Sequence, residues 1–215
     1  MSKTPQPVDW RESRRQSARA AIVDAAWAAV RDEGLAALSL RDLAHRAGIT
    51  TPTVYAYFES KHAIYDAMFG QAAEDFAAHM ARSYDTNDPR DLLVAALHRF
   101  VDFCIGDLPR YQLLFQRTIP GFEPSAGSFS PAARALAVAH GHLADNGVTD
   151  PRHLDLWTAV TTGLVDQQVS NDPGGDRWVR LIDDAIAMFL AYCQSPAPTA
   201  VLRLPLRSGT KGVQP

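Results

Sequence analysis

Residues 39–58, SLRDLAHRAGITTPTVYAYF, decide the fold of this chain. Apolar residues recur at the helical spacing on both sides of Gly48, a residue type that readily adopts the left-handed backbone of a tight turn. Pro52 suits the first turn of the second helix, where its missing N–H costs nothing. Two short helices joined in this way predict a helix-turn-helix, whose second helix enters the major groove of DNA.

The second helix of this motif has an apolar face and a polar face. Val54 and Phe58 are four residues apart, so we expect both to pack on the first helix. Short Thr51 and Ala56 suit contact with a thymine methyl group, so a guanine contact is expected from Arg41 or from the N-terminal arm. The outward face and its flanks hold the following residues: Thr50, Thr51, Pro52, Thr53, Tyr55 and Ala56.

The helix expected before the motif ends at Gly34 and begins with a cluster of arginines. Arg11, Arg15 and Arg19 are spaced by four, so they lie on one helical face, with Arg14 beside them. One interpretation is contact with DNA phosphates or the minor groove. The alternative is a solvated, charged helix start.

Charge and composition fit DNA binding at one end of the chain. The whole chain carries a net charge of −3, yet residues 1–62 hold nine basic against seven acidic side chains. Hydrophobic residues make up 47%, enough for a substantial core. The longest apolar stretch, 185–193, is too short to cross a membrane, and the two cysteines form no disulfide or zinc pattern. We therefore expect a soluble, cytoplasmic protein with no membrane partner.

The periodicity predicts an all-α protein of about nine helices, with an N-terminal three-helix helix-turn-helix domain and a C-terminal helical bundle. The predicted domains are 1–62 for DNA binding, 63–194 for ligand binding and dimerisation, and 195–215 as a flexible tail. Within the second domain the expected helices are 60–84, one after Pro89, one after Asp107, 131–144, 151–170 and 176–194, with a loop at 118–130.

The run AGITTPTVYAYFESKHAIYDAMF, residues 47–69, resembles the DNA-binding signature of the TetR family of bacterial transcriptional regulators. The preceding stretch, 20–48, is similar to that family's first two helices. The resemblance implies a homodimer that binds a palindromic operator, most often as a repressor, and is released by a small-molecule effector.

The resemblance also implies which residues face DNA. Thr50, Thr51, Thr53, Tyr55 and Tyr57 match such positions, and Lys61 matches a phosphate contact. The chain departs from many relatives in having Thr51-Pro52 in place of Lys-Gly. The full predicted DNA-binding set is Arg15, Arg19, Ser39, Arg41, Thr50, Thr51, Thr53, Tyr55, Tyr57 and Lys61.

Aromatic residues in the C-terminal part are candidates for an apolar ligand pocket, although the same pattern also suits plain core. The predicted ligand-binding residues are Phe100, Phe103, Tyr111, Phe115 and Trp157. Polar side chains that could orient a ligand there are His98, Gln112, Gln116, His140 and Asp166. The expected effector is an apolar or aromatic small molecule.

The last two expected helices carry more apolar residues than one short bundle needs to bury. The family's dimers pair these two helices into a four-helix interface, and the same is expected here. The predicted dimer-interface residues are Leu164, Trp178, Ile182, Ile186 and Phe189.

No enzyme motif is present in the sequence. It lacks a phosphate-binding loop, a dinucleotide-binding glycine motif and a nucleophile elbow, so we expect neither catalysis nor a cofactor or metal. Two alternatives to the effector-controlled regulator stay open. One is a helical interaction protein without sequence-specific DNA binding, and the other is a regulator without a small-molecule ligand.

Overall fold

The computed structural model describes residues 10–195, and the regular secondary structure in this range is entirely helical. Both the all-α prediction and the predicted number of about nine helices are confirmed for these residues. Residues 196–215 of the predicted tail lie outside the described range. The α-helices are α1 (Trp10–Glu33), α2 (Leu40–Arg46), α3 (Thr51–Tyr57), α4 (Lys61–Met80), α5 (Pro89–Gly106), α6 (Leu108–Phe115), α7 (Ala126–Asp145), α8 (Pro151–Asn171) and α9 (Ile182–Gln194). Two short 3₁₀ turns, η1 (Leu35–Ala37) and η2 (Val179–Leu181), accompany them.

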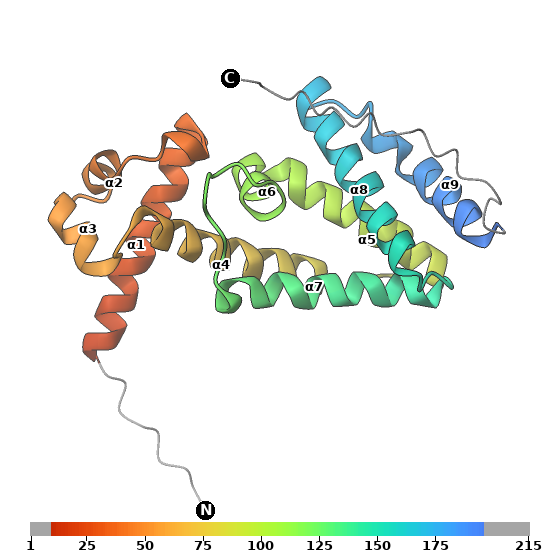
Figure 1. Ribbon diagram of the computed structural model, residues 1–215, viewed down its shortest axis with the longest axis horizontal. Helices are drawn as coiled ribbons and strands as arrows, with labels where there is room; N and C mark the ends of the chain where they lie inside the picture. The colour runs from red at the N-terminus through yellow and green to blue at the C-terminus, as the bar shows by residue number, and fades with distance from the viewer. Residues whose placement is uncertain (1–9, 196–215) are drawn as a thin grey trace, which may run out of the picture.

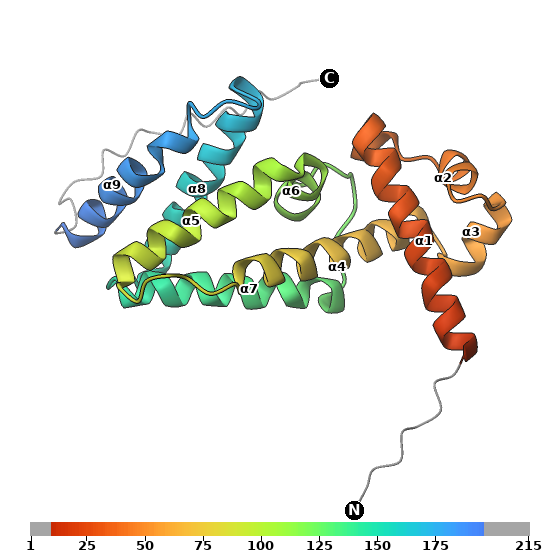
Figure 2. The same cartoon turned by 180° about the vertical axis from the view of Figure 1, so that it is seen from behind.

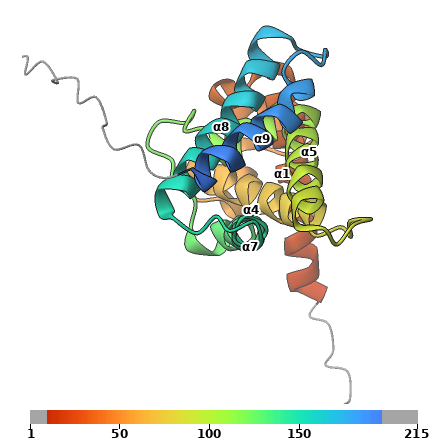
Figure 3. The ribbon, with the colours of Figure 1, turned by 90° about the vertical axis from the view of Figure 1, so that its right-hand side faces the viewer.

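The helices form two groups at opposite ends of an elongated molecule (Figure 1). We call α1–α3 the head and α5–α9 the bundle. Helix α4 joins them, since it begins directly after α3 and then lies beside α7, as the view from behind also shows (Figure 2). Seen along the long axis, α8 and α9 pack next to each other on the side of the bundle that faces away from the head (Figure 3). Among the described residues, no helix is both long and apolar enough to span a membrane.

Each group has its own apolar core. The head core joins buried residues of α1, α2 and α3 to the first half of α4, and it also takes in Leu113 from α6. The bundle core is built from α5, α6, α8 and α9 with Leu143 of α7. The head core thus continues past residue 62, as far as Ala73. The predicted domain boundary at 62 stays a prediction.

Side-chain caps fix most helix starts at the predicted positions. The hydroxyl of Ser60 accepts a hydrogen bond from the backbone N–H of Ala63, and Thr50 does the same for Thr53. Asp107 and Asp150 cap α6 and α8. Ser39 is at the N-terminus of α2 as expected, but its side chain makes no capping hydrogen bond.

The structure corrects the predicted start of α7. The sequence predicts a loop at 118–130 and a helix from Pro131, but α7 begins at Ala126, with Pro131 in its interior. The carboxylate of Asp66 on α4 accepts hydrogen bonds from Ser125 and Ser128, at 2.7 to 3.0 Å. This tertiary contact stabilises a first turn that precedes the proline and that local sequence rules assign to a loop.

Two other predicted helix bounds are wrong. Helix α4 ends at Met80 and not near residue 84. The last helix begins at Ile182, because residues 179–181 form the turn η2 in place of the helical start predicted after Asp176.

Candidate functional site

Helix α3 presents the face that the sequence predicts for DNA. Gly48 has φ 66°, the left-handed conformation that the turn requires. Val54 and Phe58 are buried against the head core, which orients the helix. Tyr55 points the other way and is 54% exposed, more than any other aromatic side chain of the motif.

An arginine holds α2 and α1 together beneath this face. The guanidinium of Arg46 lies 2.6 Å from carboxylate oxygens of Asp32 and Asp42 and 3.0 Å from Glu33. Hydrogen bonds to Asp32 and then Asp42 raise the pKa of Arg46. Since three carboxylates already surround it, this arginine positions the helix-turn-helix and contributes little charge to a DNA surface.

The structure gives Arg19 an internal role where the sequence predicts a DNA contact. Its guanidinium donates a hydrogen bond to the backbone carbonyl of Tyr57 and lies 4.1 Å from the ring centroid of Phe58. Both partners are at the C-terminal end of α3, where carbonyl groups lack helical partners and favour a cation. We therefore assign Arg19 to positioning α3.

A groove separates the start of α1 from α3. Its volume is about 610 Å³, and its α1 wall carries Arg11, Arg14 and Arg15. Its α3 wall is formed by Pro52, Thr53, Ala56 and Tyr57. Arg15, predicted to meet DNA, therefore lies beside the recognition helix.

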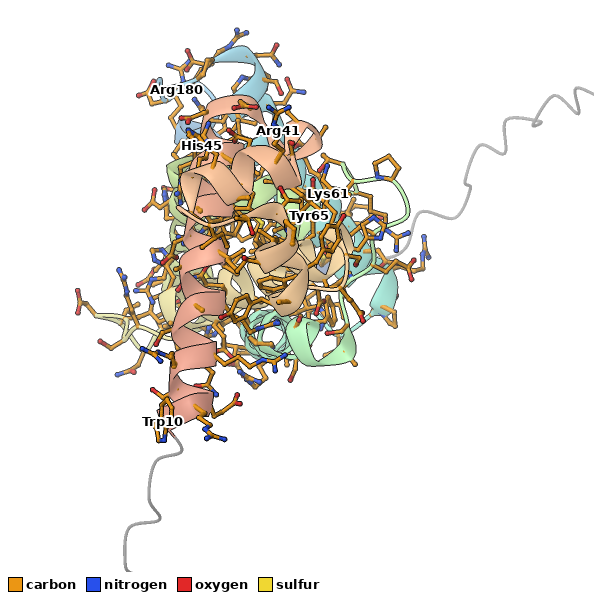
Figure 4. The ribbon with its side chains drawn as sticks, turned by 90° about the vertical axis from the view of Figure 1, so that its left-hand side faces the viewer. Trp10, Arg41, His45, Lys61, Tyr65 and Arg180 are labelled. Atoms are coloured by element: carbon orange, nitrogen blue, oxygen red, sulfur yellow. The ribbon has the colours of Figure 1, made fainter. Side chains whose placement is uncertain are left out.

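The other predicted DNA-facing residues lie on α2, on α3 and at the start of α4. Arg41 is exposed on α2, and Lys61 lies 5.5 Å from the ring centroid of Tyr65 at the start of α4. Figure 4 looks onto this end of the molecule, with Trp10 at the far end of α1 and Arg41, His45 and Lys61 grouped across from it. Exposed or partly exposed hydroxyl and amphipathic side chains complete the face: Ser39, Thr50, Thr51, Thr53 and Tyr57.

The bundle contains an apolar cavity of about 260 Å³. It lies between α4, α5, α6, α7 and α8 and includes three of the five predicted ligand residues, Phe100, Phe115 and Trp157. Phe103 does not line it, and its ring packs on Phe76 with a centroid distance of 5.1 Å.

Tyr111 is also absent from the cavity lining. Its hydroxyl donates a hydrogen bond of 2.7 Å to Asp166, and the side-chain amide of Gln116 donates to the same oxygen at 2.7 Å. Burial, together with the hydrogen bond to Asp166, raises the pKa of Tyr111. The three residues therefore form a structural link between α6 and α8, and none of the predicted polar ligand partners lines the cavity.

The sequence reasoning missed four polar residues of the cavity. Thr158, Thr161 and Thr162 follow Trp157 on α8, and His142 comes from α7. Trp157 and the three threonines lie on adjacent faces of α8, and their spacing can be read from the sequence. His142 could not be singled out by sequence, because only tertiary packing distinguishes it from His140.

The predicted dimer-interface residues differ in how exposed they are in the single protomer. Ile182, Ile186 and Phe189 are buried in the protomer's own core, which removes them from the surface of an isolated chain. Leu164 and Trp178 are partly buried. The exposed apolar side chains of α8 and α9 are different ones, namely Leu156 at 37%, Met188 at 63% and Tyr192 at 43%.

No metal centre accompanies these features in the described part of the chain, where no three His, Cys, Asp or Glu side chains are grouped to hold an ion. Cys104 is buried, and burial raises the pKa of its thiol. That thiol is therefore a core group and a poor nucleophile.

The head matches the sequence model of a known protein family. Residues 22–68 match the sequence model of the family described as bacterial regulatory proteins, tetR family. A segment of 103 residues is 30% identical to the HTH-type transcriptional activator FasR of Mycolicibacterium smegmatis. That match covers 47% of this chain and 47% of FasR, so the chain spans about half the length of this curated relative.

Solved structures share the whole architecture. A TetR family transcription regulator from Marinobacter aquaeolei VT8 superposes with a TM-score of 0.61 at 21% identity, covering 84% of this chain and 97% of that one. RolR, solved in complex with resorcinol, gives a TM-score of 0.56 at 18% identity, covering 87% of this chain and 98% of RolR. At these identities the likeness establishes the fold alone.

Proposed function

Because the chain belongs to the TetR family through its N-terminal helix-turn-helix, we propose that it is a sequence-specific, homodimeric DNA-binding regulator whose grip on a palindromic operator is loosened by a small molecule. The observation that carries this proposal is the exposed face of α3 beside an arginine-lined groove. Tyr55, Thr51 and Ala56 provide base contacts, while the arginines of the groove and Lys61 neutralise phosphates.

Dimerisation is part of the proposal because one recognition helix reads only half a palindrome. The exposed apolar residues Leu156, Met188 and Tyr192 lie on α8 and α9, and pairing of two copies there would cover them. This surface replaces the buried residues that the sequence predicts for the interface.

The cavity of the bundle is the proposed effector site. RolR, with the same fold, was solved with resorcinol bound, which supports a small-molecule role for this architecture. A ligand changes DNA affinity only if it binds one arrangement of the dimer better than the other. An element that touches both the cavity and the head must therefore carry the coupling.

Helix α6 is such an element. Leu114 and Phe115 at its C-terminal end line the cavity. At its N-terminal end Asp107 accepts a hydrogen bond of 2.7 Å from Arg31 of α1, and Arg110 lies 5.3 Å from the ring centroid of Trp27. We infer that a ligand displacing Phe115 shifts α6 and, through these contacts, the angle of α1 and its recognition helix.

Whether the bound dimer represses or activates transcription depends on the position of its operator. The relative FasR is named an activator, whereas the family resemblance favours repression. A dimer bound across a promoter blocks polymerase, and one bound upstream can recruit it. We propose repression relieved by the effector for operators that overlap the promoter.

A selection from random duplex DNA, followed by binding measurements at two salt concentrations, tests the DNA part. We expect a palindromic consensus, with Tyr55→Ala weakening binding to it at least tenfold. Arg41→Ala and Arg180→Ala are a matched pair of exposed arginines, one on α2 of the head and one on η2 between α8 and α9, and we expect a loss only for Arg41. Equal, weak binding to all sequences by wild type and Tyr55→Ala would favour the interaction-protein alternative.

A further inference from the structure

The donors and acceptors of the bundle cavity specify a ligand class. We propose that the cavity binds a neutral, largely apolar molecule bearing a hydroxyl group, and that this hydroxyl bonds to His142 and to a threonine of α8. The inference rests on the proposed effector site and deepens it by naming the chemistry of the ligand.

The lining excludes charged ligands. Among the described residues, no Asp, Glu, Lys or Arg lines the cavity. A carboxylate or ammonium group brought into it would lose its hydration without meeting an opposite charge, which is strongly unfavourable. The ligand is therefore uncharged over most or all of its surface.

The threonine hydroxyl groups of the cavity already donate their hydrogen atoms to backbone carbonyls, so they face a ligand as acceptors. The hydroxyl of Thr158 already donates to the carbonyl of Leu154 at 3.1 Å. Those of Thr161 and Thr162 donate to the carbonyl of Thr158, at 3.2 and 2.7 Å. Each keeps a free lone pair, so the complementary ligand group is a donor.

His142 supplies the second half of the site. Its Nε2 atom is buried and has no hydrogen-bond partner among the described residues. The ring is held edge-on to Tyr84 with a centroid distance of 5.9 Å, and the backbone carbonyl of the same residue accepts from Asn146. A buried polar atom without a partner is costly, and because His142 lines the cavity, a ligand toward which this ring turns gains the missing hydrogen bond.

A hydroxyl meets both requirements at once. It donates to an acceptor and accepts from a donor, so it fits His142 whichever ring nitrogen carries the proton. An ether only accepts, and a hydrocarbon does neither.

The size and walls of the cavity favour a small aromatic molecule. Its volume of about 260 Å³ falls just below the ~300–1,000 Å³ that hold drug-sized ligands. Phe76, Phe100 and Phe115 pack edge to face at centroid distances of 5.3 to 6.2 Å, leaving flat apolar surfaces. Phe115 and Phe129 also line a neighbouring pocket of about 400 Å³ and are 36% and 46% exposed, which makes them the entrance.

Four probes built on the same naphthalene ring test the proposal by calorimetry on the whole chain, with tryptophan fluorescence as a second readout. They are 1-naphthol, naphthalene, 1-methoxynaphthalene and 1-naphthoate. We expect 1-naphthol to bind about tenfold tighter than each of the other three. Equal binding of naphthol and the ether, tighter binding of naphthoate, or no binding by any probe would overturn the proposal.

A pair of variants on α7 localises the effect. His142→Leu is expected to bring naphthol down to the affinity of naphthalene, while naphthalene itself still binds. His140→Leu alters a histidine two residues away that does not line the cavity, and it should keep the tenfold preference. Loss of the preference in both variants, or in neither, contradicts the assignment to His142; should His142→Leu not fold, the ether comparison decides alone.

The DNA measurement separates this proposal from the proposed function. Preference for naphthol together with an absence of specific DNA binding would leave the ligand site intact and refute the regulator. Specific DNA binding without discrimination among the probes would do the reverse.

Discussion

The head and the bundle differ in how completely their interiors are filled. In the head, Arg46 bonds three carboxylates and Arg19 bonds the end of α3, so the recognition helix is held from two sides. In the bundle, a cavity lies between four of its helices and α4, and polar atoms such as His142 Nε2 have no partner among the described residues. A filled interior resists change, whereas an unfilled one gains contacts when a ligand enters. We therefore assign DNA recognition to the rigid head and the response to a ligand to the adjustable bundle.

The largest expected effect tests whether the two ends fold as one unit. Leu43 in the head core and Leu143 in the bundle core are both fully buried, and replacing either by alanine should lower the free energy of unfolding by about 2–5 kcal/mol. Because α6 contributes to both cores and α4 extends from the head core to the cavity, we expect a single calorimetric transition that both variants shift.

Independent unfolding of the head and the bundle would give a different result. Two separate transitions, with Leu43→Ala lowering only one and Leu143→Ala only the other, would show that the head unfolds on its own. The proposed coupling through α6 would then need a different route.

The next effect concerns the link between α6 and α8. Tyr111→Phe removes the hydrogen bond to Asp166 and leaves that carboxylate with Gln116 alone. The expected cost is about 1–3 kcal/mol in chemical denaturation, since the lost bond is buried and its acceptor is charged. Tyr55→Phe, which alters an exposed hydroxyl, should stay within about 0.5 kcal/mol of wild type. A cost for Tyr111→Phe no larger than for Tyr55→Phe would remove the structural role given to this link.

The helix-turn-helix could be predicted from sequence because its determinants are local. Gly48 sets the turn, Thr50 and Ser60 cap the helices that follow them, and Val54 and Phe58 are four residues apart. Each of these choices depends on neighbours within a few residues, so the sequence pattern and the structure agree.

The bundle resisted prediction because its determinants are distant in the chain. The start of α7 depends on Asp66, about sixty residues earlier. Both Ile186 and Met188 are apolar residues of α9, yet one is buried and the other is 63% exposed. Only the packing of α5 and α8 against α9 decides which face is core, and the same holds for His142 against His140.

Substitution of two arginines of α1 should have smaller effects, one on DNA binding and one on the stability of the head. Arg15→Gln should make the salt dependence of DNA binding less steep by about 0.9 per protomer, because one phosphate contact is lost. Arg19→Gln should leave that slope unchanged and lower the free energy of unfolding by about 1 kcal/mol, since Arg19 bonds Tyr57 and lies over Phe58. Equal changes in the salt dependence of DNA binding for both variants would show that Arg19 also contacts DNA.

The smallest effect is a pH dependence confined to the bundle side. Burial, followed by the nearby charge of Arg82, lowers the pKa of His79 from its ordinary 6.5, against the smaller opposing effect of its contact with the carbonyl of Arg99. The unfolded chain therefore binds a proton at higher pH than the folded one, so stability is complete above pH 6.5 and falls as the pH drops through the lower folded value. Urea unfolding of wild type and His79→Gln between pH 7.5 and 5 should show a steeper decline in wild type, and an NMR titration should place this histidine below 6.5. A titration above that value would mean that the ring gains a stabilising partner on folding. It would then act as a cation in the wall between α4 and α5, and lowering the pH would stiffen the side of the molecule assigned here to response.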